Sequence, residues 1–260
     1  APFFFHTILL DIMIKLDVLL LKHFGTQAAD IGNYAAAQNL AYAPTFFTAS
    51  ITILLIASLS KFEHDGRSEK TGAVAEQTFK IIAWLFPICA LVAGSRVEVI
   101  SFIFGPGYEQ AAEIISILVF ASIPLLIIQT SSGIFMAKSK PALAALLIFP
   151  APLIYLVVGL ICRNYFSLKG AAIFMVLSLA AAALINMFVI HQKWHIRYSP
   201  KSLIINILIA ICVFMAGNLI QANGIFLVAE LIITAVFIIL ALSVTGEIPR
   251  EILTSLKRKE

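Results

Sequence analysis

Long apolar runs follow one another along almost the whole chain, separated by short polar connections. Eight such runs can be marked, covering residues 3–22, 31–60, 77–104, 111–136, 141–162, 168–191, 201–220 and 224–246. Each is about twenty residues or longer, which is the length an α-helix needs to cross about 30 Å of hydrocarbon. Strands of a membrane β-barrel would instead alternate apolar and polar residues over about ten positions. The pattern predicts an all-α integral membrane protein with about eight transmembrane helices.

The composition agrees with lipid as the main solvent. Hydrophobic residues make up 61% of the 260 positions and charged residues 12%, and the mean hydropathy is +1.00. Soluble domains have about 45–50% apolar and about 25% charged residues. The net charge of +4 would suggest nucleic acid or an anionic surface in a soluble protein. In a membrane protein its distribution matters more, and no nucleic-acid partner is expected.

Lysines and arginines gather on alternate connections. Thirteen fall on one side of the predicted membrane and four on the other, while Lys15 lies inside the first run. Because cytoplasmic loops carry the excess of positive charge, this asymmetry predicts that both termini of the segment lie in the cytoplasm. The chain starts at Ala1 and enters an apolar run at once, without the basic region of a signal peptide. It is expected to be a fragment of a longer protein.

Prolines interrupt four of the runs: Pro44, Pro87, Pro124, Pro150 and Pro152. Proline inside a helix removes a backbone hydrogen bond, and membrane proteins tolerate the break where a neighbouring helix or a cavity satisfies the freed carbonyl. Transporters use such broken helices, but kinks also occur in membrane proteins without a transport role. The three cysteines all lie in apolar runs without a CxxC pair, so no metal site is expected.

Three charged residues lie inside the first run: Asp11, Lys15 and Asp17. An ionised group in the middle of a membrane helix costs about 2.5–3.5 kcal/mol on insertion scales and normally faces protein or water. Asp11 and Lys15 are four positions apart and can pair on one helical face, whereas Asp17 points elsewhere. Two interpretations stay open. One is a structural ion pair with an aspartate bonded to a neighbouring helix, and the other is a charged cavity for an anionic substrate or a coupling cation.

Four amide side chains inside the runs are further candidates for lining that cavity: Gln38, Asn39, Gln129 and Asn186. The alternative is that they form hydrogen bonds between helices and have no direct role in binding. For Glu230, in the last run, a packing or interfacial role is expected.

No enzyme motif stands out, and no catalytic residue is predicted. His6 and Asp11 have the His-x4-Asp spacing of membrane acyltransferases, but without the accompanying motifs this match is attributed to chance. The chain has no Walker loop, zinc signature or paired-aspartate sugar-nucleotide motif, and its longest connections are too short for a catalytic domain. The protein is therefore expected not to be an enzyme.

Two stretches resemble a pattern of bacterial polysaccharide transporters. The first, IKLDVLLLKHFGTQAADIGNYAAAQNLA, supplies Lys15, Asp17, Gly25, Gly32, Tyr34 and Ala37. The second, VEVISFIFGPGYEQAAEIISIL, supplies Phe104, Gly105, Tyr108, Ala111 and Leu118. The chain thereby resembles the oligosaccharide flippases of the multidrug/oligosaccharidyl-lipid/polysaccharide exporter superfamily, which include O-antigen flippases. The resemblance covers roughly residues 10–190.

That resemblance implies two six-helix lobes around a central cavity, often followed by two extra helices. This chain would then hold the second lobe (1–191), the two additional helices (192–246) and a charged cytoplasmic tail (247–260). An N-terminal lobe of the same protein would be missing. The implied substrate is an undecaprenyl-diphosphate-linked saccharide, a lipopolysaccharide or polysaccharide precursor flipped across the bacterial inner membrane by alternating access. Lys15 is a candidate for contacting the diphosphate or an acidic sugar.

Other functions remain open alternatives. A multidrug cation antiporter of the same superfamily would use Asp11 or Asp17 for proton or sodium coupling, and no other cofactor is expected. A lipid II flippase is a closer relative. From a different class, the chain could be a membrane acyltransferase or glycosyltransferase subunit. Six more helices upstream would favour a flippase, whereas a soluble catalytic domain would favour an enzyme.

Overall fold

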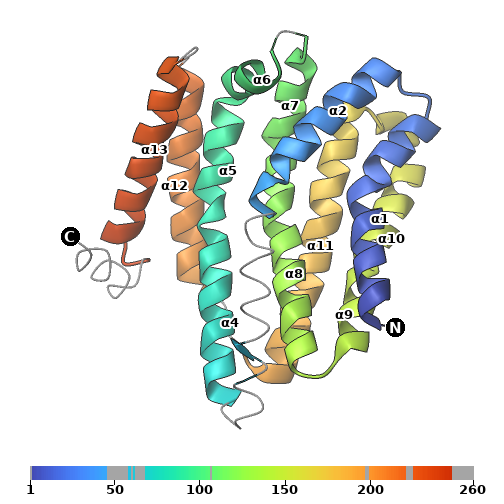
Figure 1. Cartoon of the computed structure of the whole chain (residues 1–260), viewed down its shortest axis with the longest axis vertical. Helices are drawn as coiled ribbons and strands as arrows, with labels where there is room; N and C mark the ends of the chain where they lie inside the picture. The colour runs from blue at the N-terminus through green and yellow to red at the C-terminus, as the bar shows by residue number, and fades with distance from the viewer. Residues whose placement is uncertain are drawn as a thin grey trace.

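The computed structural model describes residues 2–45, 58–59, 61, 68–105, 107–196, 199–220 and 225–247, and the elements in these ranges are helices (Figure 1). The α-helices are α1 (Pro2–His23), α2 (Ala28–Ala41), α4 (Ser68–Ala83), α5 (Leu85–Gly94), α6 (Arg96–Phe104), α7 (Glu109–Leu118), α8 (Ser122–Ala137), α9 (Pro141–Ile148), α10 (Pro150–Ile161), α11 (Leu168–Trp194), α12 (Pro200–Leu219) and α13 (Ile225–Val244). Two short 3-10 helices, η1 (Val119–Ala121) and η2 (Arg163–Tyr165), lie between them.

Several of these helices continue one another and form six spans that are long and apolar enough to cross a membrane. The spans are Thr71–Gly94, Glu109–Ala137, Pro141–Ile161, Leu168–Trp194, Pro200–Leu219 and Phe226–Val244. A helix satisfies its own backbone hydrogen bonds, which is what a lipid environment demands of any segment that crosses it. The chain is an all-α, multi-pass membrane protein.

The first two predicted runs are not among these six spans. Helix α1 has 22 residues, enough to cross a bilayer, but it carries three charges near its centre, whereas each of the six spans has at most two charged residues. The second predicted run, 31–60, includes most of α2 and then extends into residues 46–57, which lie outside the described part of the chain. The predicted total of eight spans therefore stays a prediction.

The predicted helix over 77–104 is wrong as a single element. The span ends at Gly94, Ser95 leaves the helical conformation with φ −93° and ψ 34°, and α6 runs across the end of the bundle (Figure 1). Two charged residues, Arg96 and Glu98, lie in the first turn of α6. Charged side chains are costly in hydrocarbon, so the chain turns where they begin, although the following residues are apolar again.

The predicted proline interruptions are confirmed. Pro44, Pro87, Pro124 and Pro150 each follow a break in a helix by at most three residues; the breaks are at Tyr42, Trp84, η1 and Phe149. Proline has no N–H group to donate to the carbonyl four residues earlier, so the regular ladder cannot pass through it. The breaks at Trp84, η1 and Phe149 divide long spans without ending them.

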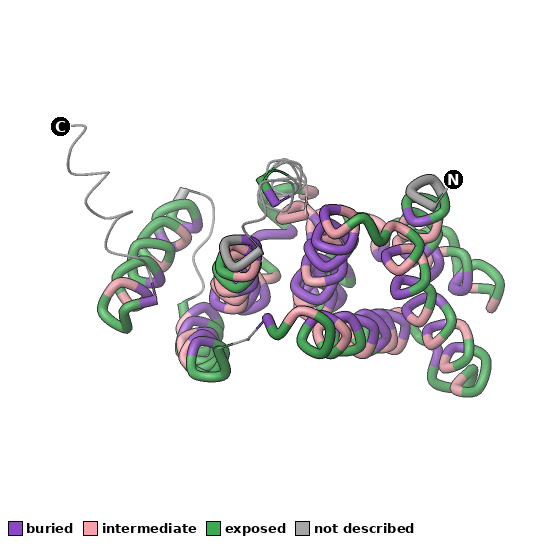
Figure 2. The backbone as a smooth tube through the Cα atoms, turned by 90° about the horizontal axis from the view of Figure 1, so that it is seen from below, coloured by how far each residue is buried: buried purple, intermediate pink, exposed green. Residues whose placement is uncertain are grey.

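Buried side chains form a large core and a small one. The large core extends from α1 to α11 and contains the fully buried Tyr34, Phe135 and Tyr155. The small core consists of Leu91, Val213, Ile238 and Leu242, and it attaches α12 and α13 to α5. Figure 2 looks along the helices and shows buried positions facing inward and exposed positions along the outer edge. Large apolar residues occupy many of those exposed positions, as expected where lipid is the solvent.

Two glycines allow α12 to lie very close to α5. A Cβ atom on Gly94 would lie 3.0 Å from the carbonyl oxygen of Phe214 and 3.2 Å from Cα of Gly217. A Cβ atom on Gly217 would lie 3.2 Å from Cα of Gly94. Small residues at such crossings are the usual way for membrane helices to gain packing contacts, because lipid offers no hydrophobic drive between them.

Candidate functional site

The most deeply buried charged residue is Asp17, near the middle of α1, with 0% of its surface exposed. The hydroxyl group of Tyr34 donates a hydrogen bond to its Oδ2 atom at 2.8 Å, and Nε2 of Gln38 donates to the same atom at 2.6 Å. The backbone N–H of Val18 donates to Oδ1 at 2.8 Å. These donors offset part of the cost of removing a carboxylate from water.

The two side-chain donors come from one face of α2. Tyr34 and Gln38 are four residues apart and therefore lie one above the other on the helix. Gln38 also donates to the carbonyl oxygen of Ile14 at 2.9 Å, so it contacts both the backbone and the aspartate of α1. Within the described ranges, no Lys, Arg or His forms an ion pair with Asp17. The cluster of Asp17, Tyr34 and Gln38 thus joins α1 to α2 by hydrogen bonds alone.

Asp11 and Lys15 lie on a different side of α1. Both are exposed, and among the residues that the structure describes no ion pair joins them. The ion pair that their spacing of four residues allows is therefore not formed between these two side chains. Exposed apolar residues, among them Ile8, Ile12 and Leu19, share this charged face of α1. The face thus combines fixed charges with apolar side chains that the described part of the chain leaves uncovered.

The amide candidates do not share one site. Gln38 belongs to the Asp17 cluster, whereas the neighbouring Asn39 is exposed and Gln129 on α8 is half-buried. Asn186 is buried, and its Nδ2 atom donates to the carbonyl oxygens of Leu147 and Ala182, both at 2.9 Å. It joins α11 to α9, which is the interhelical bonding weighed above as the alternative. All seven predicted residues lie in the described ranges, and among them only Asp17 and Gln38 are joined to each other by a hydrogen bond.

Further polar contacts join helices at positions that were not predicted to pair from the sequence, and two of them involve α1 and α13. On α1, Nε2 of His6 lies 2.8 Å from Oγ of Ser132 on α8, and both residues are buried. Near the end of α5, Oγ of Ser95 donates to Oε1 of Glu230 on α13 at 3.0 Å. This bond agrees with the packing role expected for Glu230. A single sequence holds no signal for either partner, because the paired residues are more than one hundred positions apart.

The described residues include no group of three or more His, Cys, Asp or Glu side chains that could hold a metal ion. No model of a known protein family matches the chain, and a search of curated proteins finds no match either. The class of the protein, an all-α multi-pass membrane protein, accordingly rests on its helices and their composition. Any narrower function has to be argued from the residues of α1 and their surroundings.

Proposed function

We propose that this chain forms one lobe of a transporter in the bacterial inner membrane, which flips a lipid-linked oligosaccharide by alternating access. The substrate would be a precursor of surface polysaccharide or O-antigen, carried on undecaprenyl diphosphate. The observation that carries this proposal is the charged face of α1, where Asp11 and Lys15 are both exposed within a multi-pass bundle.

Charged side chains in the middle of a membrane helix are rarely turned toward lipid, since each costs about 2.5–3.5 kcal/mol there. Helix α1 is 22 residues long, and Asp11 and Lys15 lie near its centre. The charged face must therefore meet water or another protein surface in the membrane. A water-filled cavity between this chain and a second lobe would meet that requirement, as the resemblance to flippases implies.

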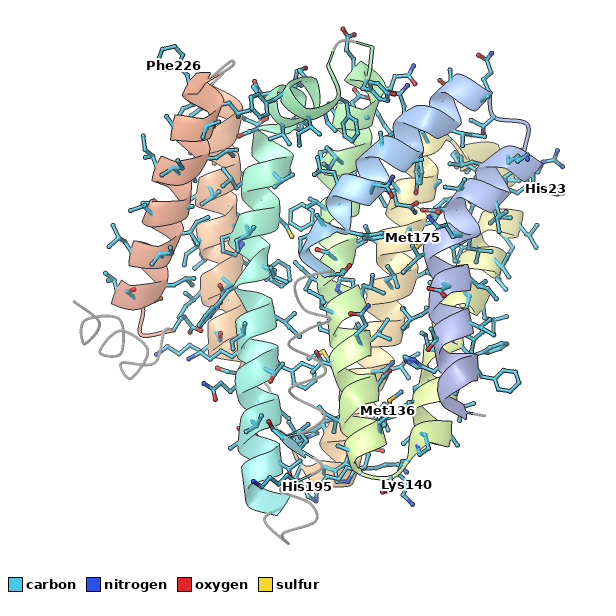
Figure 3. The ribbon with its side chains drawn as sticks, viewed as in Figure 1. His23, Met136, Lys140, Met175, His195 and Phe226 are labelled. Carbon is cyan, nitrogen blue, oxygen red and sulfur yellow. The ribbon has the colours of Figure 1, made fainter. Side chains whose placement is uncertain are left out.

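The orientation proposed for the bundle follows from its ends. Figure 3 places Lys140 and His195 at one end, and His23 and Phe226 away from it. The end with Lys140 belongs to the side with thirteen lysines and arginines, so the positive-inside rule assigns it to the cytoplasm. A lipid-linked precursor made in the cytoplasm would then approach the charged face of α1 from this end.

Lys15 would supply a fixed positive charge for the diphosphate of the substrate. A lysine ammonium is a compact charge that binds phosphate oxygens without demanding one geometry, which suits a group that must also be released. Asp17 has a different place in this scheme. Its Oδ2 atom already accepts two hydrogen bonds from α2, so Asp17 holds the helix that presents Lys15. The exposed Asp11 is the better placed of the two to meet a proton or sodium ion from water.

The test is replacement of Lys15 in cells that produce the protein from its natural reading frame. Lys15→Ala should lower surface polysaccharide at unchanged protein abundance, and Lys15→Arg should restore part of it because the charge remains. Lys22→Ala is the matched control, since Lys22 is also exposed but lies in the last turn of α1. Full surface polysaccharide in Lys15→Ala at normal abundance would contradict the role of Lys15. Loss of cation export instead would favour the multidrug antiporter.

A further inference from the structure

A cavity of about 700 Å³ lies between α4, α8, α11 and the beginning of α12. Most of its lining is apolar, and the large side chains among it include Phe79, Phe86, Ile123, Ile127, Met187 and Leu203. Its volume falls within the range of roughly 300–1,000 Å³ that is usual for sites of small molecules and cofactors. Figures 1 and 2 place α1 toward the opposite edge of the bundle from α12 and α13, so this cavity is separate from the charged face of α1.

One end of the cavity is polar, and two of the residues that line it bind a carboxylate of the chain itself. Lys80 and Ser202 both belong to the lining. The Nζ atom of Lys80 lies 3.6 Å from Oε2 of Glu247, and the hydroxyl group of Ser202 donates a hydrogen bond to the same oxygen. Ser202 and Glu247 are 3% and 5% exposed, so this carboxylate is removed from water. Two donors that converge on one buried oxygen form a built site for a negatively charged group.

Two further charged residues lie near this end of the cavity, and only one of them, Glu76, lines it. Glu76 lines the cavity one turn before Lys80, and the exposed Lys201 lies beside Ser202 in the first turn of α12. Ser199 caps this helix by accepting a hydrogen bond from the N–H of Ser202. The N-terminus of α12 therefore points to the same end of the cavity as Lys80, and its dipole adds to the attraction for an anion.

We infer that this cavity binds an anionic phospholipid, with an acyl chain among the apolar side chains and the phosphate at Lys80 and Ser202. The side chain of Glu247 occupies the phosphate position and must leave before the lipid binds. Glu247 is thus a competitor within the chain, and lipid binding requires its side chain to leave Lys80 and Ser202. A lipid is the fitting occupant because it is the surrounding solvent and because the cavity has one apolar part and one anion-binding end.

The inference is tested by counting lipids bound to the purified protein by native mass spectrometry, with diacyl phosphatidylglycerol as the probe. Lys80→Gln removes a donor to the phosphate and should lower the bound fraction by about fivefold. Glu247→Gln removes the competing charge and should raise the bound fraction by a similar factor. Lys201→Gln is the matched control and should change it by less than about twofold, because Lys201 is exposed and does not line the cavity.

The opposite signs of the first two variants separate lipid binding from a merely structural ion pair. Each variant breaks the contact between Lys80 and Glu247 equally, so a pair with only a structural role would shift lipid binding in one direction for both. That result would overturn the inference.

A second comparison tests the apolar part of the site. Ile127→Trp fills the cavity and should prevent binding, whereas Ile211→Trp places the same side chain on the exposed face of α12. Equal lipid binding by the two tryptophan variants would show that the headgroup site acts without the cavity, and would also overturn the inference. Should Ile127→Trp fail to fold, the variants of Lys80 and Glu247 still decide the question, since both side chains lie at the rim.

Discussion

The charged residues on two faces of α1 differ in their burial and in their hydrogen bonds. On one face, Asp17 is fully buried, and its two carboxylate oxygens accept hydrogen bonds from Tyr34, Gln38 and the backbone of α1. On the other face, Asp11 and Lys15 are exposed although they lie within six residues of Asp17. Helix α1 therefore carries one charged residue that is buried and hydrogen-bonded within the bundle, and two charged residues that are exposed.

The difference shows that the neighbouring helix determines whether a charged residue of α1 has a structural role or stays available for binding. Asp17 faces α2, which offers two donors one turn apart, so its charge fastens two helices to each other. The charged face of α1 is not covered by the described part of the chain, so its charges are accessible to a ligand. Residue type alone does not distinguish the structural role from the binding role, because an aspartate lies on each face.

The largest expected effect comes from removing the buried charge. Asp17→Leu leaves the hydroxyl group of Tyr34 and the amide of Gln38 without their acceptor, and each orphaned donor costs about 1–3 kcal/mol. The free energy of unfolding should fall by about 2–5 kcal/mol, measured by thermal unfolding in detergent. Asp11→Leu is the matched control and should change it by less than about 0.5 kcal/mol. Equal losses in both variants would end the distinction between the two faces.

A smaller effect is expected from removing one donor. Tyr34→Phe deletes the hydroxyl group bonded to Asp17 while keeping the buried ring in place. A hydrogen bond to a charged group contributes about 1.5–3 kcal/mol, so the free energy of unfolding should fall by that amount. Tyr108→Phe, at an exposed position outside the helices, should have no measurable effect. Stability unchanged by Tyr34→Phe would mean that the hydrogen bond from Tyr34 to Asp17 does not help to hold α2 to α1.

The smallest effect concerns the exposed charges themselves. In a double-mutant cycle with Asp11→Ala and Lys15→Ala, the stability changes should add within about 0.3–0.5 kcal/mol, as for residues without a shared contact. The measurement is again thermal unfolding of the single and double variants. A coupling energy well above that range would show that the two side chains pair in the folded protein, which would return them to a structural role.

The sequence predicted the spans well where a capping residue marks the beginning of the helix. The predicted run 168–191 corresponds to α11, which begins after the capping Ser167, and 201–220 corresponds to α12, which begins at Pro200 after the capping Ser199. Both caps are local features that a sequence displays directly. The prediction of one helix over 77–104 failed because the apolar pattern continues past Gly94 although the chain turns there. Hydropathy alone could not reveal the end of the span.

The site was harder to predict because it depends on which helices meet. Spacing placed Asp11 and Lys15 on one face, but it could not show that each stays exposed and apart from the other. The pattern of Tyr34 and Gln38 on α2 was visible four residues apart, yet nothing in it identifies Asp17 as their common acceptor. Asn186 shows the same limit, since its partner Leu147 lies 39 positions away on another helix.

In the membrane, the charged face of α1 is expected to meet water, whereas the outer face of α11 is expected to meet lipid. Cysteine labelling in intact membranes tests this most directly, after Cys89, Cys162 and Cys212 are replaced by serine. Thiols react with a membrane-impermeant maleimide only where water reaches them.

Lys15→Cys should be labelled, and Leu184→Cys should not, although Leu184 is 66% exposed in the absence of lipid. Labelling of Leu184→Cys without labelling of Lys15→Cys, or protection of both positions, would contradict the account.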